Sequence, residues 1–125
     1  MDDAFLGALL AQVHSAVQAY LDTGAHGLID LLRLPMPPER IEALRARLGQ
    51  GEITMTLEAE GTSHIRETAL AGVWWIDHHD RAGHLVARLI EIGPVPQIVP
   101  ADADAMRAAL GALDALADCN AGEAK

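Results

Sequence analysis

HIRETALAGVWWIDHHDRAGHLVARLIEIGPVP (residues 64–96) is the stretch that decides the fold. It holds both tryptophans and the most strand-like run in the chain, rich in β-branched and aromatic residues. Gly72 marks a bend or bulge, and the DRAG run is typical of a hairpin turn in which Gly83 takes positive φ. The stretch therefore predicts antiparallel strands linked by tight turns, at about 64–70, 73–79 and 84–92.

The regions on either side extend this sheet. Residues 51–60 alternate between apolar and polar side chains, the pattern of a strand with one buried and one wet face. The GTS run at 61–63 predicts a short turn, so the 64–70 strand returns antiparallel. The apolar run 27–34 is short and fits either a buried strand or a helical turn. Residues 95–99 could add an edge pairing.

Three segments show the apolar spacing of amphipathic helices, at about 3–22, 38–48 and 103–118. Their predicted starts are Asp2 or Asp3, Pro38 and Asp102. In the last helix we expect the apolar side chains to face inward, namely Met106, Ala109, Leu110, Leu113, Leu116 and Ala117.

Helices beside hairpin-linked strands indicate an α+β fold. We expect an antiparallel sheet of about four strands, a β-meander over roughly 51–92, packed with an N-terminal, a middle and a C-terminal helix. A chain of 125 residues has the size of one domain, so we expect a single domain over 1–125 with an ordered core at about 3–118.

Acidic residues outnumber basic ones by 18 to 9, which gives a formal net charge of −9. This charge repels phosphate backbones and anionic membranes, so no nucleic-acid or membrane partner is expected. Cys119 is the single cysteine, so no internal disulfide forms, and without an evident base it is not expected to be a nucleophile. The acidic start of the chain is unlike a secretory signal. We therefore expect a cytoplasmic protein.

Histidines bracket the second hairpin turn, where His78, His79 and His84 lie near Asp77 and Asp80. Hairpin-linked side chains could converge on a metal ion. However, adjacent strand residues point to opposite faces, so His78 and His79 cannot both bind one ion without a bulge. Surface histidines near a turn are the simpler interpretation, and a metal site formed by the three is kept as an alternative.

Two carboxylates, Glu67 and Glu91, occur among apolar residues in strands that the pattern places side by side. They could form a catalytic pair with shifted pKa values, but an ion pair with Arg66 or Arg88 is the simpler interpretation. The glycines of LGQGE (48–52) are not accompanied by the Lys and Ser/Thr of a phosphate-binding loop.

Trp74 and Trp75 are adjacent in a predicted strand and therefore point to opposite faces. Both cannot enter one core from a flat strand. We expect one indole to be buried and the other to cover the far face or a partner. An exposed indole near acidic residues is typical of protein recognition, because it supplies a large contact area.

Short motifs run through the chain in a consistent order: LL (9–10), Gly24, IDLL (29–32), LP (34–35), LGQGEI (48–53), ET (67–68), GVW (72–74) and IEIGPVP (90–96). The series resembles the C-terminal domain of the HupH family of bacterial hydrogenase expression/formation proteins. The resemblance covers about Leu9 to Val99, and ET-x3-GVW and IE-x3-VP are its most specific parts. The residues that match the family pattern are Glu52, Glu67, Thr68, Gly72, Trp74, Glu91 and Pro96.

The resemblance implies an accessory role in the maturation of NiFe hydrogenase. Family members are thought to act as non-enzymatic assembly chaperones associated with the small, Fe–S-carrying subunit. The family has no established catalytic residue to transfer, and its typical members carry a further N-terminal region.

We therefore expect a protein without catalytic activity or cofactor that binds a hydrogenase subunit precursor or another maturation protein. The predicted docking surface is the exposed side of the 64–92 hairpins, formed by Glu67, Thr68, Trp74, Trp75 and Glu91. An exposed sheet edge or the first helix could mediate a homodimer. The alternative is a metal- or cofactor-handling protein that uses His78, His79 and His84.

Overall fold

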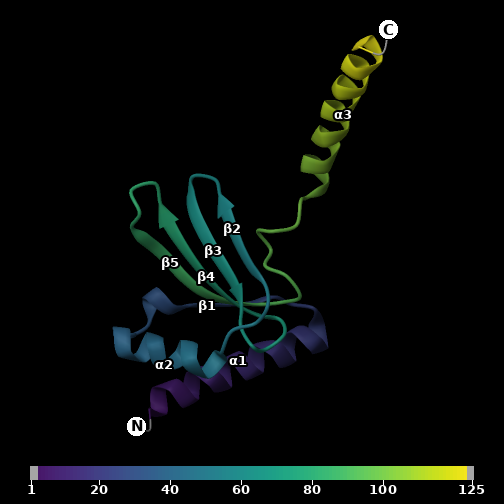
Figure 1. Ribbon diagram of the computed structural model, residues 1–125. Coiled ribbons are helices and arrows are strands. Elements are labelled where there is room, and N and C mark those ends of the chain that lie inside the picture. Colours follow the sequence, from purple (N-terminus) through teal and green to yellow (C-terminus); the bar gives the residue numbers. More distant parts are fainter. Residues whose placement is uncertain (1–2, 124–125) are drawn as a thin grey trace.

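The computed structural model describes residues 3–123, which form an antiparallel sheet, two helices on one of its faces and a third helix that projects away (Figure 1). The helices are α1 (Ala4–Thr23), α2 (Pro38–Leu48) and α3 (Ala103–Glu123), with a 3₁₀ helix, η1 (Leu31–Arg33). The strands are β1 (Gly27–Asp30), β2 (Thr54–Glu58), β3 (Gly61–Glu67), β4 (Val73–Asp80) and β5 (Leu85–Ile92). The predicted α+β class is confirmed, with five strands in place of about four.

The strands lie in the order β1-β5-β4-β3-β2, and each neighbouring pair is antiparallel. The run from β2 to β5 is the predicted meander. β1 adds to the free edge of β5, with Gly27 opposite Ile92. The ambiguous 27–34 run is a strand followed by a helical turn, because the Asp30 side chain accepts a hydrogen bond from the Leu32 N–H (3.1 Å) and starts η1.

Two expectations about the connections are wrong. Gly61 begins β3, so the turn lies at 59–60 and not at 61–63. Residues 95–99 form no strand, and the Val99 N–H instead donates to the Pro96 carbonyl (3.0 Å) in a turn. Residue composition indicates whether a segment favours a turn or a strand. It does not show how far backbone pairing extends, because that depends on the neighbouring strands.

Asp3 caps the start of α1, and its carboxylate accepts hydrogen bonds from the backbone N–H groups of Phe5 (2.9 Å) and Leu6 (3.3 Å). Gly24 caps the end of the helix, with φ at +78°. The Asp3 carboxylate also accepts a hydrogen bond from Arg40 Nε (2.9 Å), which ties α1 to α2. This arginine contact holds the pKa of Asp3 below its ordinary value.

The main core lies between the sheet and the two helices, α1 and α2, that cover one of its faces (Figure 1). Its buried members come from both helices, β1, η1, β4 and β5: Leu6, Leu9, Val13, Ile29, Leu31, Ile41, Leu44, Leu48, Val73, Trp75, Ile90 and Ile92. By length and composition alone, α1 is apolar enough to cross a membrane. Its buried side chains show that the apolar face of α1 packs on this sheet.

The opposite face of the sheet carries a smaller apolar cluster of Ile65, Trp74 and Ile76. The chain that follows β5 closes one end of this cluster. The Trp74 indole N–H donates to the Gly93 carbonyl (3.0 Å), and Pro96 is fully buried. The chain then passes to the β2 side of the sheet before α3 begins (Figure 1).

The prediction that the apolar side chains of α3 face inward is wrong. The helix extends away from the sheet (Figure 1), and each of its side chains up to residue 118 is exposed. These include Met106, Ala109, Leu110, Leu113, Leu116 and Ala117. Apolar periodicity identifies an amphipathic helix but not the surface against which it packs. The side chain of Cys119 lies outside the described residues.

Candidate binding surfaces

Trp74 and Trp75 point to opposite faces of β4, as the alternation predicts, but both are buried. Trp74 is 2% exposed in the smaller cluster, and Trp75 is 4% exposed in the main core. The expectation that one indole is exposed is therefore wrong. The sheet has an apolar cover on each face, α1 and α2 on one and the chain around Gly93 and Pro96 on the other.

Two further residues of the predicted docking surface, Thr68 and Glu91, are buried and bonded to backbone. The Thr68 hydroxyl donates to the Val73 carbonyl (2.9 Å) and accepts from the Leu70 N–H (3.1 Å). The Glu91 carboxylate accepts from the Gln97 N–H (2.7 Å). Both side chains thus hold loops in place, and a role in partner binding stays a prediction for them.

Glu67 and Glu91 do not form a pair, because β4 lies between their strands. Trp74 is opposite Glu67 in β3 and opposite Glu91 in β5, so two strand spacings of about 4.8 Å each separate the two glutamates. Arg88, one expected partner, instead donates to Asp77 (2.7 Å). The idea of a carboxylate pair rested on adjacent strands, and the register contradicts it.

The glycine-rich loop between α2 and β2 packs on the end of β3. The Gly51 N–H donates to the Glu67 carbonyl (2.8 Å), and the Ala69 N–H donates to the Leu48 carbonyl (3.0 Å). A Cβ placed on Gly51 would lie 2.5 Å from the Thr68 carbonyl oxygen. The LGQGE and ET motifs therefore form one structural unit, a pairing that neither motif indicates alone.

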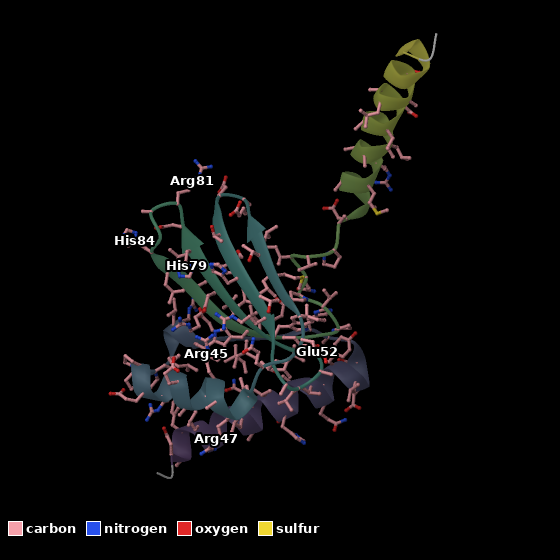
Figure 2. The ribbon with its side chains drawn as sticks, in the orientation of Figure 1. Arg45, Arg47, Glu52, His79, Arg81 and His84 are labelled. Atoms are coloured by element: carbon pink, nitrogen blue, oxygen red, sulfur yellow. The ribbon has the colours of Figure 1, made fainter. Side chains whose placement is uncertain are left out.

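A polar cleft of about 290 Å³ opens between α2, the loop after it and β3. The polar residues that line it are Glu42, Arg45, Gln50, Arg66, Glu67 and Thr68, and Trp75 lies in its wall. Figure 2 shows Arg45 on the side of α2 that faces the sheet and Arg47 on the side away from it. Among the five predicted docking residues, Glu67 is half-buried, whereas the other four are buried.

A wider groove of about 640 Å³ runs between α1 and the turn that joins β3 to β4. Its lining is mainly apolar and includes Leu10, Val13, Val17, Leu21, Leu70 and Val73. Leu21 is 73% exposed and Leu70 is 49% exposed. The sequence did not predict this groove, because α1 and the turn meet only through the tertiary fold.

The largest row of exposed apolar side chains lies on α3. Met106, Leu110, Leu113 and Leu116 are 58–63% exposed, and we call them the α3 stripe. Their spacing of four, three and three residues places them along one side of the helix. The apolar spacing of these residues is visible in the sequence and predicts an amphipathic helix. It does not show whether the apolar side of that helix faces the core or the solvent.

The histidines of the second hairpin do not converge. The rings of His78 and His79 lie on opposite faces: His78 contacts Ser63, whereas His79 packs edge-to-face on His64. At the exposed end, His84 and Asp80 pair at 3.3 Å, and the backbone N–H of His84 is the main cause of a lowered Asp80 pKa. Within the described residues, no group of three His, Cys, Asp or Glu side chains could hold a metal ion.

The domain is of the α+β class, with an antiparallel sheet covered on one face by two helices. Its candidate binding surfaces are the polar cleft, the apolar groove beside α1 and the α3 stripe. The chain belongs to the family described as HupH hydrogenase expression protein, C-terminal conserved region, whose sequence model matches residues 6–119. This confirms the resemblance that the short motifs indicated.

Individual relatives agree with the family assignment. The chain is 33% identical over 92 residues to hydrogenase expression/formation protein HoxQ of Azotobacter vinelandii. The aligned stretch covers 74% of this chain and 32% of that protein. The chain is 30% identical over 91 residues to hydrogenase expression/formation protein HupH of Rhodobacter capsulatus, covering 73% and 33%. The chain thus spans about a third of the length of these curated relatives.

A solved structure shows the same fold. Hydrogenase expression protein HupH from Thiobacillus denitrificans superimposes with a TM-score of 0.87 at 38% sequence identity. The match covers 93% of this chain and 98% of that one.

Proposed function

We propose that this domain is a non-catalytic accessory factor in NiFe hydrogenase maturation, which binds a hydrogenase subunit precursor or another maturation protein. Its relatives are named hydrogenase expression/formation proteins, which supports the process. The observation that supports binding is the α3 stripe, a row of large apolar side chains on a helix of which no described residue belongs to either buried cluster.

The stripe has the physical properties of a docking element. Burial of apolar surface is the dominant favourable term in most protein–protein association, and the four exposed side chains of the stripe can supply it. An amphipathic helix that presents anchors at i, i+4 and i+7 fits an apolar groove of a partner. An incompletely assembled subunit exposes such apolar surface, and binding would cover it until assembly.

The charges on α3 add orientation. Asp104, Asp114 and Asp118 are exposed on the helix, and Arg107 pairs with Asp104 at 2.6 Å. The helix is therefore acidic around its apolar row, and it favours a partner groove with a basic rim. This acidity also disfavours self-association of α3 through like-charge repulsion.

The predicted docking residues enter this proposal in two roles. Glu67 lines the polar cleft and can contact a partner directly. Thr68, Trp74, Trp75 and Glu91 are buried, and we propose that they support the surface by holding its loops and strands. Their substitution would then weaken binding through loss of structure, not through loss of a contact.

Co-purification from a host that produces the hydrogenase tests the proposal. A tagged Leu110→Ser/Leu113→Ser variant should recover hydrogenase precursor or maturation protein at least about tenfold less than the wild type, because two apolar anchors are lost. The matched control is Ala108→Ser/Ala115→Ser, which adds two hydroxyls on the opposite side of the same helix. Equal recovery with both variants would overturn the proposal.

A further inference from the structure

The polar cleft contains two arginines without a carboxylate partner. Among the described residues, no Asp or Glu oxygen lies within 4.0 Å of the Arg45 or Arg66 guanidinium. Arg40 and Arg88 are half-buried to a similar degree, and each contacts a carboxylate, at 2.9 and 2.7 Å respectively. A half-buried guanidinium is normally paired, so Arg45 and Arg66 are available for a ligand.

Both arginines lie beside Trp75. The Arg45 guanidinium carbon is 5.2 Å from the centroid of the Trp75 ring, within the range of a cation–π contact. Arg66 is directly opposite Trp75 on the neighbouring strand, so their side chains share a face. The cleft therefore presents one cation from α2 and one from β3 beside the same indole.

Trp75 also carries an unused donor. Its Nε1 is buried and has no hydrogen-bond partner, whereas Nε1 of Trp74 donates to the Gly93 carbonyl at 3.0 Å. Leaving a buried N–H unpaired costs about 1–3 kcal/mol, so Trp75, which lines the cleft, carries an unsatisfied donor that a native structure rarely leaves unexplained.

One glutamate restricts what that ligand is. Glu42 of α2 lines the same cleft as the two arginines, whereas Glu67 is opposite Trp74 and its side chain lies on the other face of the sheet, so a polyanion is not favoured. A single carboxylate between the arginines, flanked by N–H groups opposite Glu42, matches these charges. A volume of about 290 Å³ is at the lower limit of small-ligand sites and suits one side chain with its flanking backbone.

We infer that the polar cleft binds an acidic side chain of a polypeptide, with the carboxylate held between Arg45 and Arg66 beside Trp75. The arginines supply the charge and the planar donor geometry that carboxylates prefer. Glu42 and Gln50 supply acceptors for the backbone that carries it. This site is separate from the α3 stripe and does not depend on the hydrogenase proposal.

Titration of ¹⁵N-labelled protein with the blocked peptide acetyl-Ala-Glu-Ala-amide tests the inference. The chain contains two tryptophans, so two indole N–H signals report on the two sides of the sheet. The Trp75 signal should shift saturably, and the Trp74 signal, whose N–H is already bonded, should stay in place. The same peptide with Gln in place of Glu should produce no saturable shift.

Arginine variants locate the site. Arg45→Gln and Arg66→Gln should each weaken binding by roughly tenfold or more, because each removes a charged hydrogen-bond donor. Arg47→Gln is the matched control, since Arg47 is exposed on the other side of the same helix. An unchanged Trp74 signal in each variant shows that the domain is folded.

Four results would overturn the inference. The first is the absence of a saturable Trp75 shift with the Glu peptide. The second is equal binding of the Gln peptide, and the third is equal weakening of binding by Arg47→Gln. The fourth is binding of sodium succinate as tight as that of the Glu peptide, which would assign the cleft to free carboxylates and not to a polypeptide.

Discussion

Trp74→Ala should destabilise the domain by about 4 kcal/mol. A buried tryptophan removes about 150–250 Å² from water, and at about 25 cal/mol/Å² this corresponds to about 4–6 kcal/mol, which is an upper value. Core Trp→Ala substitutions typically cost about 3–5 kcal/mol. Trp74 is 2% exposed, and its Nε1 also donates to the Gly93 carbonyl at 3.0 Å. The variant therefore loses the indole and leaves a buried carbonyl without this donor.

Urea unfolding monitored by far-UV circular dichroism measures this loss. A domain of this size has a total stability of about 5–15 kcal/mol, so the midpoint should fall steeply or the variant should be partly unfolded in water. Trp74→Phe keeps an aromatic ring and should lose only about 1–2 kcal/mol. Leu113 is 58% exposed on α3, so the free energy of unfolding of the control variant Leu113→Ser should stay within about 0.5 kcal/mol of wild type. A wild-type midpoint for Trp74→Ala would refute the assignment of this indole to the core.

Three further predictions concern stability. Arg40 holds the folded-state pKa of Asp3 low, so the Asp3 carboxylate stabilises the fold above its unfolded pKa and loses this effect as pH falls below about 4. Asp3→Asn should therefore reduce the fall in melting temperature below about pH 4, measured by thermal melts at several pH values. Gly51→Ala should lower the urea midpoint, since its Cβ would lie 2.5 Å from a backbone oxygen, whereas Gly7→Ala, with nothing within 4 Å, should raise it by up to about 1 kcal/mol. Removing residues 101–125 should leave the melting temperature of the remaining body unchanged, because the described side chains of α3 are exposed, and a large drop would show that α3 packs on it.

The strands and helices with strong local patterns were predictable. The alternation at 51–60 and the turn glycine Gly83 defined the meander, and Pro38 fixed the start of α2. The four-residue β1 was ambiguous because its partners in β5 lie 59 to 65 residues away in the sequence, and no local pattern reports such a contact. The same limit explains α3, where periodicity gave the helix but not its exposure.

The candidate site was predicted less well for a related physical reason. Alternation correctly separated Trp74 from Trp75, but an exposed indole was inferred from the assumption of one core. The chain after β5 builds a second apolar cover, which buries Trp74 and gives Glu91 a backbone partner. Several residues that carry the family resemblance thus hold the fold, and the accessible chemistry lies elsewhere.

The polar cleft illustrates what local patterns omit. Arg45 comes from α2 and Arg66 from β3, and only the packing of the glycine loop on β3 brings them to one cavity. In the sequence Arg45 belongs to a mixed-charge helix, and Arg66 was interpreted as a partner for a neighbouring glutamate. Neither residue type nor spacing indicated a shared site.

The central claim is that the α3 stripe contacts a hydrogenase subunit precursor or another maturation protein. Photo-crosslinking in a hydrogenase-producing host tests it most directly, with p-benzoylphenylalanine placed at Leu113 in one variant and at Ala115, on the opposite side of the helix, in another. We predict covalent adducts that contain such a protein for position 113 and few or none for position 115. No adduct at position 113, or equal adducts at both positions, would contradict the account.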